Sequence, residues 1–287
     1  MLSLNNFTRF TYLVSLSFNQ ANAFISSLTI KSRDFTNLSA FPFKNDFLTG
    51  KKVLITGGND GLGAAITEGF IKVGADVVVI ARNKEKFNQL KCDLNSESIA
   101  FIEADLADSE QIKKAGKTAL DWADGTIDIL VNNAGVALLD PLLSLSPEKW
   151  DKTMAINVRA PFLLAQICAP GMIEKKGGKI INITSQAGTV GLDEHGAYCA
   201  SKSALDSLTR VMAKEWSKHN IQCNSIGPTV VLTEMGKKVW GGKKGEEFLK
   251  LLPLGRFAEP EEVANTVLFL CSDAANIICG QTILMEG

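Results

Sequence analysis

The sequence predicts an α/β fold, a single doubly wound Rossmann-type parallel sheet of about seven strands with helices on both faces. Apolar, β-rich segments alternate with helical patterns from Gly50 to the end of the chain, and this is the order that repeated βαβ units produce. The segment DVVVIA (76–81) is also almost continuously Val and Ile, as expected for a strand covered on both faces. Together the two observations favour a parallel sheet inside two helical layers.

The expected elements follow one another without interruption. Strands are predicted over 51–56, 76–81, 98–106, 126–135, 178–185, 221–228 and 281–287. Between them, helical patterns occupy 64–74, 108–122, 147–175, 196–218 and 260–272. Because no repeat or Pro-rich linker divides this region, we predict one domain over 48–287.

Composition excludes several classes of function. The 287 residues include 30 basic and 31 acidic side chains. The chain therefore lacks the excess positive charge that is typical of proteins that bind nucleic acid. The six cysteines form no C-x-x-C pair and there are two histidines, so we expect neither a metal site nor a disulfide framework. No run of 18 apolar residues suggests a membrane span.

Residues 1–47 differ from the rest in composition and are predicted to be a leader, either a targeting extension or an untargeted, disordered one. Arg9 precedes the short apolar run FTYLVSLSF (10–18), and ANA (21–23) follows it, which resembles a signal peptide. Phe24 directly after ANA also resembles the plastid presequences of algae with complex plastids. A plastid or secretory route and an untargeted, cytoplasmic protein therefore both stay open.

The turn TGGNDGLG (56–63) joins the first predicted strand to the first helix. Glycines allow a tight turn there and a close approach of the backbone to a phosphate, while the helix N-terminus offers free N–H groups. In doubly wound sheets, ligands bind at this carboxyl edge of the strands. The turn therefore predicts dinucleotide binding.

The end of the second strand bears on the choice of cofactor. NAD-specific enzymes usually place an acid here, whereas an arginine suits the 2′-phosphate of NADP. The chain has Ala81 and then Arg82, which favours NADP(H) over NAD(H). Asp60 in the glycine turn argues mildly against NADP(H), because its carboxylate could lie near the same phosphate. The alternative interpretation of Arg82 is a solvated loop residue without a role in cofactor binding.

The segment HGAYCASK (195–202) places Tyr198 four residues before Lys202. On a helix these side chains share one face, one turn apart. A phenol ordinarily titrates near pH 10, and a neighbouring ammonium favours its ionised form. The pair is a candidate for proton transfer.

These motifs closely resemble the short-chain dehydrogenase/reductase family over nearly all of 48–287. The matching segments are TGGNDGLG (56–63), NNAG (132–135), Asn157, Ser185 and YCASK (198–202). Within the family, the xylulose reductases and related polyol dehydrogenases are most similar, through NNAGVALLDPLL (132–143), Gln186, His195, PTVVLTEMG (228–236), Trp240 and PLGRFAEPEEV (253–263).

The resemblance implies a catalytic tetrad of Asn157, Ser185, Tyr198 and Lys202. Tyr198 is the general acid or base, and Lys202 with the oxidised nicotinamide lowers its pKa while also binding the ribose. Ser185 holds the substrate oxygen, and Asn157 positions a water next to the lysine. The implied cofactor-binding residues are Thr56, Gly57, Asn59, Gly61, Leu62, Gly63, Arg82, Asp105, Asn133, Ala134, Gly135, Tyr198, Lys202, Pro228, Val230 and Thr233.

The substrate pocket is implied to contain Ser185, Gln186, His195 and Trp240. Amide and imidazole groups form hydrogen bonds with hydroxyls, which suits a polyhydroxy ketone better than a lipid. The alternatives to a role in substrate binding are that His195 faces the solvent at the start of its helix and that Trp240 only packs against neighbouring side chains. Two departures from the family pattern are Thr229, where glycine is more usual, and the end of the chain at Gly287, where relatives usually continue.

Three hypotheses follow. The first is an NADP(H)-dependent reductase of small ketoses or dicarbonyls that runs in reverse as a polyol or secondary-alcohol dehydrogenase. The second is a 3-oxoacyl-[acyl-carrier-protein] reductase of fatty-acid synthesis, and the third is a nucleotide-sensing scaffold without turnover. The resemblance also implies a homo-oligomer, commonly a tetramer built through the helices near 147–175 and 196–218.

Overall fold

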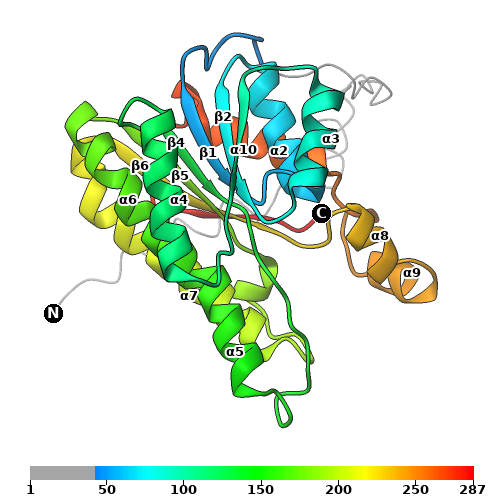
Figure 1. Ribbon diagram of the computed structural model, residues 1–287. Helices are drawn as coiled ribbons and strands as arrows, with labels where there is room; N and C mark the ends of the chain where they lie inside the picture. The colour runs from blue at the N-terminus through cyan, green and yellow to red at the C-terminus, as the bar shows by residue number, and fades with distance from the viewer. Residues whose placement is uncertain (1–42) are drawn as a thin grey trace, which may run out of the picture. The chain divides into compact units, whose positions relative to one another are not determined.

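Seven parallel strands form one sheet in the order β3-β2-β1-β4-β5-β6-β7 (Figure 1). They are β1 (Lys52–Thr56), β2 (Asp76–Ala81), β3 (Ile99–Glu103), β4 (Ile129–Asn132), β5 (Gly178–Ile183), β6 (Ile221–Pro228) and β7 (Thr282–Met285). The strand order reverses between β1 and β4, which is where a doubly wound sheet binds ligands. The predicted fold class is confirmed.

The structure, a computed structural model, describes residues 43–287. The compact unit begins at Phe43, five residues before the predicted domain boundary, and residues 45–50 form turns. Leu48 donates its N–H to the carbonyl of Val73 at 3.1 Å, so this turn is tied to the end of the first helix. The targeting prediction for the leader rests on residues outside the described part of the chain.

Two helical layers cover the sheet. On one face α2 (Gly61–Lys72) packs against α10 (Pro260–Cys271), and on the other lie α4 (Ser109–Trp122), α6 (Ala160–Lys175) and α7 (Gly196–Trp216) (Figure 1). The core between the sheet and the second layer contains the fully buried side chains of Leu54, Ile80 and Leu164. Removing this apolar surface from water is the main source of stability.

Three helices were not expected from the sequence pattern. Helix α3 (Lys84–Leu94) follows β2 and buries only Phe87, so its apolar periodicity is weak. Helices α8 (Glu234–Val239) and α9 (Lys243–Leu249) lie in the long segment after β6. They are shorter than three turns, and so short a helix leaves little periodic signal in a sequence.

The helix predicted over 147–175 is interrupted. Helix α5 (Pro147–Met154) is followed by a π-helical turn, η1 (Ala155–Arg159), and then by α6. Among the described residues, Pro147–Lys175 is also the one helical stretch with the length and apolarity of a membrane span, with a mean hydropathy of 1.3 and half of its window buried in the protein. A π-turn commonly marks a functional position, and this one contains Asn157.

Candidate active site

In the glycine turn after β1, the backbone forms a cradle whose two ends approach too closely for side chains. A Cβ atom on Gly63 would lie 2.0 Å from the carbonyl oxygen of Gly57, which itself has a positive φ of 63°. Asp60 precedes α2 but its side chain caps none of the helix N–H groups. These groups and the positive end of the helix dipole suit a pyrophosphate.

The turn is joined to the NNAG loop after β4. The hydroxyl of Thr56 accepts hydrogen bonds from the N–H groups of Asn133 and Ala134, both at 3.0 Å. The Asn133 amide donates to the carbonyl oxygens of Thr56 at 3.0 Å and Gly57 at 3.2 Å. The two predicted cofactor loops therefore form one rigid edge at the switch point of the sheet.

Basic side chains dominate the corner after β2. Arg82 is exposed beside Ala81, the last residue of β2. Asn59 donates to the carbonyl oxygen of Asn83 at 2.7 Å, which fixes the glycine turn against this corner. Lys86 forms an ion pair with Asp60, so the acid that argued against a phosphate is already paired with a cation.

Three distant motifs converge at Gly135. A Cβ atom there would lie 3.3 Å from Nζ of Lys202 and 3.4 Å from Oδ1 of Asn157. The fully buried Asn157 accepts a hydrogen bond from the N–H of Val136 at 2.8 Å and donates to the carbonyl of Val136 at 2.9 Å. It also donates to the hydroxyl of Ser201 at 3.0 Å, which links η1 to α7.

Lys202 lies in a dry environment. It is 3% exposed, and its ammonium donates to the carbonyl oxygen of Ile183 at 2.8 Å. The same nitrogen lies 5.6 Å from the centre of the Tyr198 ring. Burial lowers the pKa of Lys202 to about 8, and the negative charge of Asp206 opposes this shift.

The phenol of Tyr198 is buried next to Ser185. Burial raises the pKa of the phenol above its ordinary value, and a hydrogen bond with the Ser185 side chain opposes this effect. The predicted lowering of the Tyr198 pKa requires Lys202 and the oxidised nicotinamide together, and it stays a prediction. A neutral phenol is the form that donates a proton to a carbonyl oxygen.

Of the residues predicted to bind substrate, Gln186 and His195 lie next to the tetrad residues Ser185 and Tyr198, whereas Trp240 packs on other aromatic rings. Gln186 directly follows Ser185 and accepts a hydrogen bond from the Thr229 hydroxyl at 3.0 Å. The His195 ring lies edge-on to Tyr198, with 6.1 Å between ring centres. Trp240 packs on Phe248 and Phe257, at 4.7 Å and 6.3 Å between ring centres, so its described ring contacts lie within the segment after β6.

The remaining predicted cofactor residues lie around the same edge. Asp105 accepts a hydrogen bond from the N–H of Ala107 at 3.0 Å. Pro228 ends β6, Val230 is 7% exposed, and Thr233 caps α8. A Cβ atom on Gly61 would lie 3.4 Å from the methyl group of Thr233. The segment after β6 therefore packs on the glycine turn beside Leu62.

Sequence reasoning missed three residues that act on this site through others. Lys86 pairs with Asp60, Asp206 acts on Lys202, and Thr229 binds Gln186. The Lys202–Asp206 spacing of four residues and the replacement of a usual glycine by Thr229 were visible signals. The Lys86–Asp60 pair was not, because it joins the glycine turn to α3, 26 residues away in the chain.

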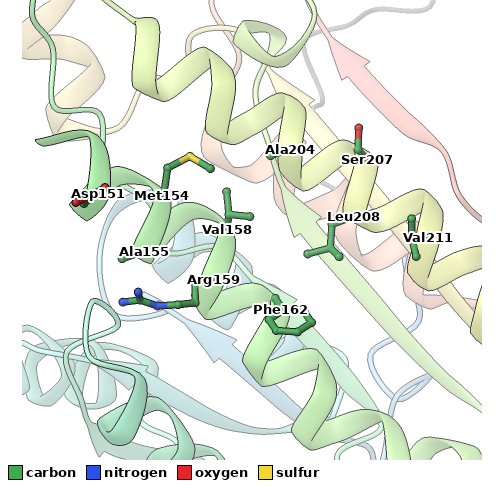
Figure 2. A pocket seen from close by; sticks show the side chains of 10 residues that line it. All are labelled: Asp151, Met154, Ala155, Val158, Arg159, Phe162, Ala204, Ser207, Leu208 and Val211. Carbon is green, nitrogen blue, oxygen red and sulfur yellow. The ribbon is translucent and has the colours of Figure 1, made fainter. Parts of the chain in front are cut away.

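A cavity among the described residues lies away from this site. An apolar groove of about 670 Å³ runs between α5, η1, α6 and α7 (Figure 2). Its apolar walls include Val158, Phe162 and Val211, and Asp151 and Arg159 lie at one end. Phe162 and Val211 are 38% and 51% exposed. No residue of the tetrad lines the groove, so it is not the reaction centre.

Comparisons with known proteins agree with this geometry. The sequence model of the family described as enoyl-(acyl carrier protein) reductase matches residues 57–287. The chain is 45% identical to an NAD-dependent glycerol dehydrogenase of Listeria innocua (85% of this chain, 96% of the relative) and 43% identical to a D-threitol dehydrogenase of Mycolicibacterium smegmatis (84% and 93%).

Two further similarities extend the comparison. The chain is 40% identical to an L-xylulose reductase of Bos taurus, over 84% of this chain and 96% of the relative. The crystal structure of a levodione reductase superposes with a TM-score of 0.79 at 29% identity, covering 83% of this chain and 97% of that one. The similarity therefore covers more than four fifths of the chain.

Proposed function

Because the chain belongs to the short-chain dehydrogenase/reductase family, a family of nicotinamide-dependent enzymes that act on CH–OH groups, we propose that it reduces a small ketose or dicarbonyl with NADPH. In the reverse direction it oxidises a polyol or secondary alcohol. The observation that carries the proposal is the convergence of Lys202 and Asn157 on Gly135, with Tyr198 and Ser185 beside them.

The chain's own side chains supply the proton chemistry. The nicotinamide, when bound, supplies or accepts the hydride. The Ser185 hydroxyl holds the substrate oxygen, where negative charge develops as the carbonyl is reduced. Tyr198 donates its proton to that oxygen, and the Lys202 ammonium stabilises the phenolate that remains. Asn157 fixes the loop after β4 next to Lys202.

Preference for NADP(H) rests on the corner after β2. Arg82 supplies a guanidinium next to the place where the adenosine ribose binds in a dinucleotide fold, and guanidinium groups bind phosphates by paired hydrogen bonds. The Lys86–Asp60 pair reduces the repulsion that Asp60 would otherwise exert on a 2′-phosphate. The named NAD dependence of the Listeria innocua relative makes this preference a point for direct measurement.

A polar, hydroxyl-bearing substrate is favoured by the groups beside Ser185. Gln186 and His195 both carry hydrogen-bonding groups, and three relatives have names that refer to glycerol, threitol or xylulose. The acyl-carrier-protein alternative rests on the description of the matching family, which names an enoyl and not a 3-oxoacyl substrate. An acyl thioester is thus the appropriate competing substrate.

The test measures NADPH and NADH oxidation by the full chain with L-xylulose, diacetyl and an acetoacetyl thioester. The proposal predicts that kcat/KM with NADPH is at least about tenfold higher for the ketose or the diketone than for the thioester. Preference for the thioester would instead make the protein a fatty-acid enzyme. Activity with NADH alone would contradict the role given to Arg82.

We further propose that the groove between α5, η1, α6 and α7 is the contact between copies of this chain. The exposed apolar side chains of Phe162 and Val211 would leave water on association. Asp151 and Arg159 at the groove end are oppositely charged, so each can pair with the other residue of a second copy across a two-fold axis. A tetramer then needs a second contact elsewhere.

A further inference from the structure

We propose that Thr229 is a specificity-determining positioning residue, because it holds the Gln186 amide so that its N–H donors stay available to an oxygen next to the reacting carbonyl. The inference rests on the proposed function, since it names how that same site recognises a hydroxylated ketone. The observation that carries it is the 3.0 Å hydrogen bond from the Thr229 hydroxyl to Oε1 of Gln186.

The backbone of Gln186 is fixed independently of its side chain. Its carbonyl oxygen accepts hydrogen bonds from the N–H groups of Thr189 at 2.8 Å and Val190 at 3.0 Å. The preceding Ser185 hydroxyl accepts one from the N–H of Ala187 at 3.1 Å. With the main chain held on both sides, the orientation of the terminal amide is the variable that remains.

Thr229 is equally well anchored. Its N–H donates to the carbonyl oxygen of Met285 at 3.1 Å, immediately after β6 ends and beside β7. The side chain therefore reaches Gln186 from a fixed main chain. A glycine at this position would leave Oε1 of Gln186 without its described partner.

The terminal amide of glutamine has an oxygen that accepts hydrogen bonds and an NH₂ group that donates two, and these two ends have nearly the same shape. The Thr229 hydroxyl, acting as donor, occupies the acceptor Oε1. The Nε2 group, with two N–H bonds, is then the end of Gln186 left for a ligand. Without the hydroxyl, the amide turns at little cost and presents either end.

The place of Gln186 determines what these donors meet. The residue follows Ser185, which forms a hydrogen bond with Tyr198 and holds the reacting oxygen in the proposed mechanism. Donors one residue away suit a second oxygen on a neighbouring carbon, as in an α-hydroxy ketone or a ketose. A ketone without that oxygen gains nothing from them.

The test is a double-mutant cycle on Thr229→Val and Gln186→Leu, which remove the hydrogen-bonding groups and nearly keep the shape. Thr229→Val should lower kcat/KM for L-xylulose about five- to tenfold, the effect of one hydrogen bond, mainly through KM. Thr229→Ser, which keeps the hydroxyl, should remain within about twofold of the wild type. In the Gln186→Leu background, Thr229→Val should change kcat/KM less than about twofold.

A matched substrate pair gives a second measurement. Thr229→Val should reduce the preference for 3-hydroxy-2-butanone over 2-butanone, which lacks only the hydroxyl. The proposal is overturned if Thr229→Val leaves kcat/KM for L-xylulose unchanged, or if its effect is equally large in the Gln186→Leu background. Failure of the proposed function is distinct, because it appears in the wild type as preference for the thioester.

Discussion

Nζ of Lys202 lies 5.6 Å from the centre of the Tyr198 ring, one helical turn away on the same face of α7. The two side chains approach from a helix whose first turn begins at Gly196, while Ile183 of β5 binds the ammonium at 2.8 Å. The relative position of phenol and ammonium is therefore set by one rigid helix and one strand end. Such preorganisation is what charge stabilisation during a reaction requires.

Gly63→Ala tests the cradle. The added Cβ atom would lie 2.0 Å from the carbonyl oxygen of Gly57, so either the turn or α2 must move. Overpacking of this kind costs about 1–3 kcal/mol, and we expect a lower melting temperature and a loss of NADPH binding. Gly191→Ala is the control, because no atom lies within 4 Å of its added Cβ. Equal behaviour of the two variants would contradict the cradle.

Arg82→Ser tests the choice of cofactor. Loss of a charged hydrogen bond to the 2′-phosphate should weaken NADPH binding about tenfold or more, with little effect on NADH, and titration of cofactor fluorescence measures both affinities. Lys91→Ser is the control, since Lys91 lies on α3, the helix that follows Arg82, and pairs with Glu97. An equal loss of affinity for both cofactors would show that Arg82 does not distinguish NADPH from NADH by its 2′-phosphate.

Asp206→Asn tests the electrostatics of Lys202. Burial lowers the pKa of Lys202 to about 8 and Asp206 opposes this, so the ammonium, the active form, is lost as pH rises through about 8. Removing the negative charge lowers that pKa further, and the alkaline limb of kcat should move to lower pH. Asparagine keeps an acceptor for the Thr282 hydroxyl, which binds Asp206 at 3.0 Å. A pH profile unchanged in position would contradict this role.

Val211→Asp tests the proposed contact between copies. Val211 is 51% exposed in the groove between α5, η1, α6 and α7, and a carboxylate there would be costly to bury. Sedimentation velocity should show a smaller assembly than the wild type. Ile277→Asp is the control, because Ile277 is 93% exposed and lies outside the groove. Dissociation by the control alone would place the contact elsewhere.

The order of strands and helices could be predicted because apolar periodicity is strong where elements are buried. The extent of β2 followed from an almost continuous apolar run that ends at Ala81, and β6 also has the predicted bounds, 221–228. The π-turn around Asn157 could not be predicted, because its apolar neighbours fit an ordinary helix equally well. Helix α3 was missed because it buries a single aromatic residue.

The motif residues of the site could be identified from their spacing in the sequence. Their burial and their contacts with one another could not. Burial raises the pKa of Tyr198 and the Ser185 side chain opposes this, and neither the burial nor the contact can be read from the sequence. The Asp60–Lys86 pair and the Thr229–Gln186 bond each join segments that lie at least 26 residues apart in the chain. Contacts of this kind become visible only when the sheet is assembled.

The most direct test of the account compares Tyr198→Phe with the wild type, using L-xylulose and NADPH. The variant keeps the ring but loses the proton donor, so kcat should fall about 100-fold or more, while the affinity for NADPH stays close to that of the wild type. That result would also exclude a nucleotide-sensing scaffold, because the wild type turns over and the loss is specific to chemistry. Turnover by Tyr198→Phe at the wild-type rate would contradict the central claim that Tyr198 exchanges the proton.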